Sequence, residues 1–418
     1  MFRLLAVGLL CTTPAIADDG NWPMWRGPRG DGTSTESGFP TRWTATENVR
    51  WKTPIPGKGH SSPIVWGDRL FITSAIEAGD PKEPMDRLLF CIDRKDGRVI
   101  WQKTVVRAKL ESLHKLNSRA SSTPATDGER VYVTFLDNPK VVVAAYDFAG
   151  NEVWKRSPGE FESTHGFCSP PILYKDLVIV NCDQDAFKKS KPAYIVALDR
   201  ATGEERWRID RTHRIRSYTP PLIVEAAGKM QMVLTGAETV ASYDPDTGKP
   251  IWTIDGPTEQ FVASMVYSNG LFFLTAGFPT YHVMGIKPDG TGNVTKTHVA
   301  WHVENGGAGY VPSPVAHGDL LFLVHDNGQA TCRDAKTGKL RWMERLGKHH
   351  SASPVCVDDR LYFTDDDGNT FVVKAAAKFE LIEKNPIGEE CYASPALSNG
   401  EIFLRGSKHL FCIGAGQR

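Results

Sequence analysis

The sequence has no excess of charge of either sign and, beyond its first residues, no long apolar run. Lys and Arg total 49 and Asp and Glu total 49, so the formal net charge is zero. A protein that neutralises nucleic-acid phosphates needs a basic surface, and this balance leaves room only for a local basic patch. A membrane-spanning helix needs about 20 consecutive, mainly apolar residues. We therefore expect neither a nucleic-acid partner nor a transmembrane segment.

Metal-binding and phosphate-binding motifs are also missing. No C-x-x-C pair occurs, so a zinc site is not predicted. Seven cysteines follow residue 17, an odd number that cannot all pair within one chain, and most lie in apolar stretches typical of buried thiols. Cys168 and Cys182 flank a predicted hairpin from Pro170 to Asn181, so a disulfide between them is considered. Gly306–Gly309 lacks the Lys-Ser/Thr pair of a phosphate-binding loop.

The N-terminus has the features of a signal peptide. Arg3 precedes a short apolar run, and Ala15-Ile16-Ala17 is an A-x-A cleavage site. We interpret residues 1–17 as a signal peptide, which predicts a periplasmic or secreted bacterial protein; a buried N-terminal strand is the structural alternative. Lipid anchoring at Cys11 is not expected, because Leu10 stands where lipoprotein signals usually carry a small residue.

An internal repeat dominates the rest of the chain. Each unit begins with a Ser/Thr-Pro pair, followed by an apolar strand, a turn and a second apolar strand. Units of about 40–50 residues are typical of four-stranded propeller blades. The eight copies are Ser62-Pro63, Thr123-Pro124, Ser169-Pro170, Thr219-Pro220, the degenerate Ser264-Met265, Ser313-Pro314, Ser353-Pro354 and Ser394-Pro395.

The second half of each unit carries an Asp, a Gly and a Trp, as in Asp199, Gly203 and Trp207. The Asp side chain can bond local backbone N–H groups, and Gly adopts the positive φ that closes the turn. One Trp per unit, on the fourth strand, is expected to pack against the neighbouring blade and to bury about 150–250 Å². The seventh unit has Leu381 in the comparable stretch.

The two ends of the repeat region are complementary. The eighth unit ends at Cys412-Ile413 without a fourth strand, whereas Val49–Thr53, with its Trp, precedes the first Ser-Pro pair. Pairing these ends would remove the exposed edges, while an open solenoid would need capping units. We predict an all-β, eight-bladed β-propeller over residues 49–418, closed by an N-terminal strand that completes the last blade. Residues 18–48 are predicted to form an ordered arm across it, and the insertion Arg107–Leu116 to form one or two helical turns.

The segment from Ala193 to Trp207 closely resembles the pyrroloquinoline-quinone (PQQ) type of repeat, whose core is A-x-D-x-x-T-G-x-x-x-W. The match covers nearly the whole chain after residue 17, and the resemblance implies an eight-bladed propeller. It also implies two functional branches. Quinoprotein dehydrogenases bind PQQ and calcium in the central funnel, whereas the BamB-type subunit of the outer-membrane protein assembly machinery binds protein partners without a cofactor. The repeat alone therefore implies no cofactor.

Polar and aromatic residues just ahead of the Ser/Thr-Pro pairs are predicted to point into the central funnel. Any one of these residues could instead have a structural role, in which its side chain forms hydrogen bonds with backbone groups at the strand entrance. As a set, arginines and histidines suit an anion, because Arg binds carboxylates bidentately; PQQ, acidic sugars and peptide C-termini are anions. These candidates are His60, Arg119, His165, Arg216, Tyr310, His349, His350, Glu390 and Tyr392.

The favoured function is a periplasmic binding or scaffold propeller, monomeric and similar to the outer-membrane assembly subunit. Its partner would be an envelope protein or a small anionic ligand; no cofactor is expected, and no catalytic residue is assigned. The first alternative is a PQQ-dependent alcohol or sugar dehydrogenase with calcium. The sequence has no clear match to the Glu, Asn and Asp calcium ligands of that family. Asp183–Asp185 and Asp365–Asn369 contain oxygen ligands, but the latter is interpreted as a hairpin turn. The second alternative is a carbohydrate-active propeller with His as acid or base.

Overall fold

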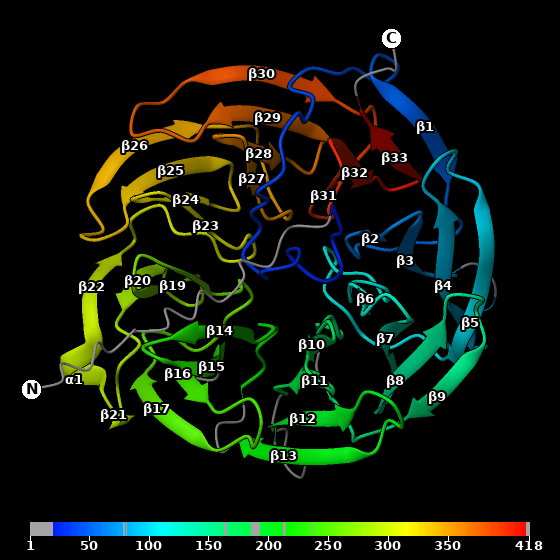
Figure 1. Cartoon of the computed structure of the whole chain (residues 1–418), viewed down its shortest axis with the longest axis horizontal. Coiled ribbons are helices and arrows are strands. Elements are labelled where there is room, and N and C mark those ends of the chain that lie inside the picture. Colours follow the sequence, from blue (N-terminus) through cyan, green and yellow to red (C-terminus); the bar gives the residue numbers. More distant parts are fainter. Residues whose placement is uncertain are drawn as a thin grey trace, which may run out of the picture.

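The computed structural model describes residues 20–414 except 78, 79, 81, 163, 164, 185–192, 212–214 and 237. The predicted signal peptide and Asp185 lie outside the described residues. The described strands form eight sheets arranged as a ring of blades (Figure 1). In each blade the first strand lies nearest the centre and the fourth lies at the rim, so the predicted eight-bladed, all-β propeller is confirmed.

The first four blades follow one another along the chain. Blade 1 contains β2 (Ile64–Trp66), β3 (Arg69–Ala75), β4 (Met85–Asp93) and β5 (Val99–Ala108). Blade 2 contains β6 (Ala125–Thr126), β7 (Arg130–Asp137), β8 (Lys140–Asp147) and β9 (Glu152–Arg156). Blade 3 contains β10 (Ile172–Tyr174), β11 (Leu177–Cys182), β12 (Ala193–Asp199) and β13 (Glu205–Arg211). Blade 4 contains β14 (Leu222–Ala226), β15 (Lys229–Gly236), β16 (Thr239–Tyr243), β17 (Pro250–Asp255) and the short β21 (Gly292–Asn293), which pairs parallel to β17.

The remaining blades include the only described helix, α1 (Thr295–His298). Blade 5 contains β18 (Val266–Ser268), β19 (Leu271–Ala276), β20 (His282–Ile286) and β22 (Val299–Glu304). Blade 6 contains β23 (Val315–His317), β24 (Leu320–Val324), β25 (Gln329–Asp334) and β26 (Leu340–Arg345). Blade 7 contains β27 (Val355–Val357), β28 (Arg360–Thr364), β29 (Asn369–Lys374) and β30 (Leu381–Pro386). Blade 8 contains β31 (Ala396–Ser398), β32 (Glu401–Arg405), β33 (His409–Ile413) and β1 (Val49–Pro54). Over the described part of the chain, no helix has the length and apolar character needed to span a membrane.

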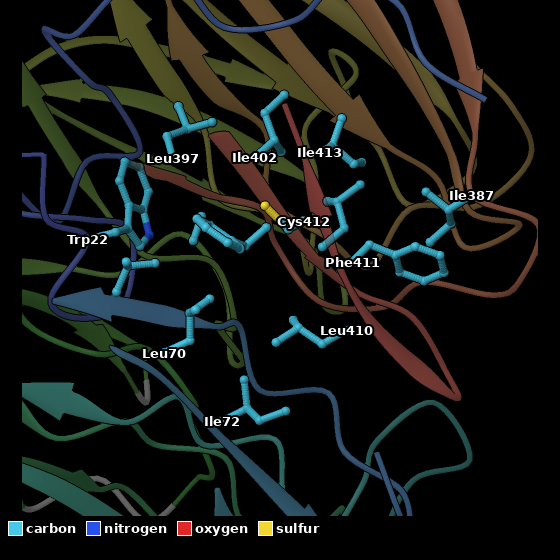
Figure 2. Packing of buried hydrophobic residues seen from close by; sticks show 14 of the residues in the cluster. Trp22, Leu70, Ile72, Ile387, Leu397, Ile402, Leu410, Phe411, Cys412 and Ile413 are labelled. Atoms are coloured by element: carbon cyan, nitrogen blue, oxygen red, sulfur yellow. The ribbon is translucent and has the colours of Figure 1, made fainter. Parts of the chain in front are cut away.

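Blade 8 closes the ring as predicted. β1 pairs antiparallel with β33, and Trp51 lies opposite Cys412 (Figure 1). Figure 2 shows the resulting core, in which Leu70 and Ile72 of blade 1 lie on the side of β33 that carries Leu410, and Phe411 points towards Ile387. Both faces of an inner strand are buried against neighbouring blades, which explains why these strands are continuously apolar instead of alternating with polar residues.

The rim tryptophans join successive blades. In five junctions the indole N–H donates to a backbone carbonyl in the turn of the next blade, and the ring covers the turn. At one of them a Cβ added to Gly203 would lie 2.6 Å from the Trp154 ring, so only glycine fits there. The five bonds are Trp51 to Arg94 (2.8 Å), Trp101 to Phe148 (3.0 Å), Trp154 to Arg200 (3.0 Å), Trp301 to Ala335 (2.9 Å) and Trp342 to Ala376 (2.9 Å).

At the junction between blades 4 and 5, the link runs through a glutamine side chain. The indole N–H of Trp252 donates to Oε1 of Gln231 at 2.8 Å, and Nε2 of Gln231 donates to the Pro288 carbonyl at 2.9 Å. Gln231 is fully buried. A side-chain amide has both a donor and an acceptor, so Gln231 carries the inter-blade link where the Asp-turn of blade 5 is irregular.

Two sequence predictions are wrong. Arg107–Leu116 forms no helix: β5 stays paired with β4 as far as Ala108, and buried Glu111 then pairs with Arg87. Cys168 and Cys182 are free thiols. The β10–β11 ladder pairs Ile172 with Ile179, and its continuation would place Cys182 opposite Ser169, not opposite Cys168.

Residues 20–48 cross the centre of the ring (Figure 1). Trp22 forms a β-bridge with Val65 of blade 1, and Trp43 stacks on Tyr362 of blade 7 with ring centroids 6.4 Å apart. Arg26 is buried, and its guanidinium donates to the carbonyls of Pro314 and Pro354, at the entrances of blades 6 and 7. The arm is thus fixed to several blades and covers one end of the propeller axis.

Candidate ligand-binding cavity

A cavity of about 410 Å³ lies on the propeller axis. The segments that precede the innermost strands of all eight blades contribute to its wall, and Trp25 of the arm contributes as well. The Trp25 indole N–H donates to Ser264 Oγ at 2.8 Å, which fixes the ring against blade 5. The position two residues before the Ser/Thr of each pair lines the cavity in six blades: His60, Ser121, Val262, Val311, Ser351 and Tyr392.

The Ser/Thr residues of the repeat hold this wall together. Their hydroxyl oxygens accept backbone N–H groups from the preceding blade, so adjacent entrances are linked around the axis. These bonds stabilise the ring of strand entrances around the axis. The four bonds are Ser62 N to Thr123 Oγ1 (3.0 Å), Ser264 N to Ser313 Oγ (2.9 Å), Ser313 N to Ser353 Oγ (2.9 Å) and Ser353 N to Ser394 Oγ (2.9 Å).

The cavity wall is rich in aromatic and imidazole rings. His60 stacks on Tyr392 with ring centroids 4.6 Å apart, and His114 meets His165 edge-on at 5.6 Å. The other tyrosines are Tyr218, Tyr281 and Tyr310. Burial lowers the pKa of His60 to about 4, and the positive charge of Arg405 adds to this effect. His60 is therefore neutral at physiological pH.

His349 and Asp366 form a pair at the wall of blade 7. His349 Nδ1 lies 2.5 Å from Asp366 Oδ2, and the other carboxylate oxygen accepts the backbone N–H of Ser351 at 2.7 Å. The hairpin interpretation of Asp365–Asn369 is supported, because the Gly368 N–H donates to the Asp365 carbonyl. The second residue of this turn, Asp366, orients His349 at the cavity wall. The sequence identified His349 as a candidate but did not reveal this role of Asp366.

Blade 6 has a related arrangement around Asp326. This carboxylate lines the cavity and accepts the backbone N–H groups of Tyr310 at 3.1 Å and Val311 at 2.9 Å. Burial raises its pKa. Asp326 and Asp366 occupy the same position in their blades, two residues before the glycine of the turn that follows the second strand. Alignment of the repeats could therefore have identified both as candidate site residues.

The structure separates the predicted site residues into two groups. His60, His165, Tyr310, His349 and Tyr392 line the cavity. Arg216 does not belong to this lining, and its Nε donates to His165 Nδ1 at 3.0 Å.

Three other candidates are not part of the cavity wall. His350 is completely buried and donates from Nε2 to the Leu346 carbonyl, and Glu390 is exposed outside the wall. Arg119 belongs to an ion-pair network, with NH1 2.8 Å from Glu77 and Nε 3.3 Å from Glu111. These charges balance one another within the protein.

Comparisons with known proteins agree with this architecture. A polyvinylalcohol dehydrogenase from a Pseudomonas species is 25% identical over 211 residues, which cover 48% of this chain and only 30% of that enzyme's length. The outer membrane protein assembly factor BamB of Shewanella oneidensis is 20% identical over 344 residues, covering 79% of this chain and 81% of that protein. The crystal structure of BamB from Moraxella catarrhalis has a TM-score of 0.60 at 12% identity, covering 87% of this chain and 98% of that one, which shows the fold alone.

A family model also matches most of the chain. Residues 40–157, 191–294 and 292–378 match the PQQ_2 family, described as outer membrane protein assembly factor BamB. These segments include most of the propeller blades. The chain therefore belongs to the PQQ_2 family of BamB-like propellers.

Proposed function

We propose that this protein is a non-catalytic binding propeller of the bacterial cell envelope, and that its central cavity holds a ligand or a segment of a partner. The observation that carries the proposal is the character of the cavity. Its wall is rich in aromatic and imidazole rings and short polar side chains, and no Arg or Lys belongs to its described lining. The Arg119 network and the His349–Asp366 pair balance charges within the protein. Such a wall is suited to recognition by shape and hydrogen bonding.

The wall does not fit PQQ with calcium. Calcium takes about 6–8 oxygen ligands. Along the described part of the wall there is one carboxylate, that of Asp326, and it already accepts two backbone N–H groups. No cluster of three or more His, Cys, Asp or Glu suited to a metal occurs among the described residues. The three carboxylates of PQQ would need cations, but no Arg or Lys belongs to the described lining.

An envelope location and a protein partner complete the proposal. They are supported by membership of a family described as an outer membrane protein assembly factor and by the coverage of the Shewanella relative. A rigid ring with a fixed arm would present the same surface to a partner before and after binding.

Reconstitution tests the choice between binding protein and dehydrogenase. Purified protein is dialysed with PQQ and calcium, and then assayed for retained quinone absorbance and for dye reduction with primary alcohols. We expect neither. Stoichiometric retention of the quinone or alcohol-dependent dye reduction would refute the proposal. In parallel, immobilised protein is expected to retain a component of an envelope extract, identified by mass spectrometry, that a Tyr310→Trp variant with a filled cavity does not retain.

A further inference from the structure

We infer that the central cavity binds an uncharged saccharide, with the sugar ring against the aromatic wall and a hydroxyl donated to His349. This inference rests on the proposed binding function and names its ligand class. It depends on three properties of the wall: the hydrogen-bond acceptor at His349, the absence of lining cations among the described residues, and the combination of flat rings with small polar groups.

The first property is the acceptor provided by His349. Its Nδ1 is engaged by Asp366 at 2.5 Å, and Asp366 is itself fixed by the Ser351 N–H and hydroxyl. In the neutral imidazole this arrangement places the proton on Nδ1 and a lone pair on Nε2. Since His349 lines the cavity and about 40% of its side chain is exposed, Nε2 is the ring nitrogen left for a ligand. A lone pair requires a donor, which a sugar hydroxyl supplies and a carboxylate does not.

The second property is charge. The described wall contains no Arg or Lys, and the low pKa of His60 keeps that ring neutral. The carboxyl group of Asp326 is satisfied by backbone N–H groups. An anionic ligand would thus lose its hydration without gaining a lining cation, which costs more than burying a neutral hydroxyl that finds a partner.

The third property is the combination of flat rings with small hydroxyl and amide groups. The C–H faces of a sugar pack on aromatic faces, which carry negative charge density, while its hydroxyls both donate and accept. Trp25, Tyr218 and Tyr392 supply rings, and Asn117 and Ser121 supply polar groups within the same wall. The cavity volume of about 410 Å³ lies within the range of about 300–1,000 Å³ typical of small-ligand sites.

The test uses the intact protein with defined probes. Isothermal titration and saturation-transfer NMR are performed with the methyl glycosides of glucose, galactose and mannose and with cellobiose; glucuronate and choline serve as charged comparators. At least one neutral probe is expected to bind, and both charged probes to bind at least tenfold more weakly. Absence of binding by every neutral probe, or tighter binding of a charged one, would overturn the inference.

Variants at the proposed contact provide the second readout. His349→Phe keeps a ring but removes Nε2 and should weaken binding at least tenfold, whereas His349→Gln restores an acceptor and should recover part of the affinity. His317→Phe is the matched control. His317 Nε2 lies 2.7 Å from Asp359 Oδ1, so it also pairs with an Asp, but it is not part of the cavity lining. Equal affinity of His349→Phe and the wild type would contradict the assignment.

Two measurements keep the outcome clear. If His349→Phe does not fold, long-range ¹H–¹⁵N spectra of the wild type still report on His349: the Nε2 signal should move towards a hydrogen-bonded value on addition of the binding glycoside, and an unchanged signal refutes the contact. If the low-molecular-weight fraction of an envelope extract raises the melting temperature but no neutral glycoside binds, the saccharide assignment fails while the binding function stands. Retention of PQQ would instead refute the binding function itself.

Discussion

Acidification is expected to destabilise the protein through His60. Burial, reinforced by the positive charge of Arg405, lowers the pKa of this imidazole from 6.5 to about 4, although the Leu116 carbonyl and the Glu77 carboxylate oppose the shift. Above pH 6.5 the ring is neutral in both the folded and the unfolded chain. Below that pH the unfolded chain takes up a proton that the folded protein rejects, so the free energy of unfolding falls until the pH reaches about 4.

The magnitude follows from the size of this shift. At about 1.4 kcal/mol per pKa unit, the two values differ by about 3 kcal/mol, which is an upper bound because part of the ring is open to the cavity. The assay is urea unfolding followed by tryptophan fluorescence at pH 7.5, 6.5, 5.5 and 4.5. His60→Phe keeps the stacking on Tyr392 but cannot titrate, so its loss of stability on acidification should be smaller by about 1–3 kcal/mol. An identical pH dependence in both proteins would refute the reasoning. The buried His350 also has a lowered pKa, but it contributes equally to both proteins and cancels in the comparison.

Three further predictions concern the propeller itself. Gln231→Leu removes the relay between Trp252 and Pro288 and should lower the free energy of unfolding by about 2–4 kcal/mol in urea titrations, because buried polar groups lose their partners; a loss below about 0.5 kcal/mol would contradict the proposed link. Gly203→Ala should cost about 1–3 kcal/mol more than Gly228→Ala, since both glycines have positive φ but only the former would place Cβ against an indole ring; equal melting temperatures would show that the ring moves aside. Thiol titration of a chain that begins at residue 18 should give seven thiols after denaturation, whereas five would indicate a disulfide. In the native state Cys168 should react slowly at pH 7.5, because burial raises its pKa to about 12.

Much of the fold was accessible from the sequence because the repeat encodes contacts between neighbours along the chain. The Ser/Thr-Pro pair, the Asp-Gly turn and the rim Trp each recur at the same place in a blade. Trp51 indicated ring closure because it was the only Trp strand without its own unit. Gln231 gave no such signal: its role depends on an irregular turn in the next blade, which the local sequence does not reveal.

The candidate site was only partly accessible. The repeat register indicates which backbone segments reach the axis, and five of the candidates line the cavity: His60, His165, Tyr310, His349 and Tyr392.

Side-chain direction and pairing are set by other segments, which the repeat does not specify. Arg119 pairs with Glu111, a residue of the insertion between blades 1 and 2. Trp25 and Tyr281 lie outside the strand entrances, and the arm and the loop that carry them reach the cavity only in the folded ring.

The structure also explains why a repeat that identifies the fold so clearly says so little about the ligand. The residues that join the blades, such as Ser353 at the axis and Trp342 at the rim, direct their polar atoms to neighbouring blades. The residues that face the cavity, such as Ser351 and Tyr392, stand two positions before the joining residues and take no part in those links. Substitution at the cavity positions therefore leaves the inter-blade bonds intact, and the same ring can carry an aromatic, neutral wall in one protein and a charged, metal-binding wall in another. For that reason a saccharide ligand is inferred from His349, Asp366 and the lining rings, and not from the family resemblance.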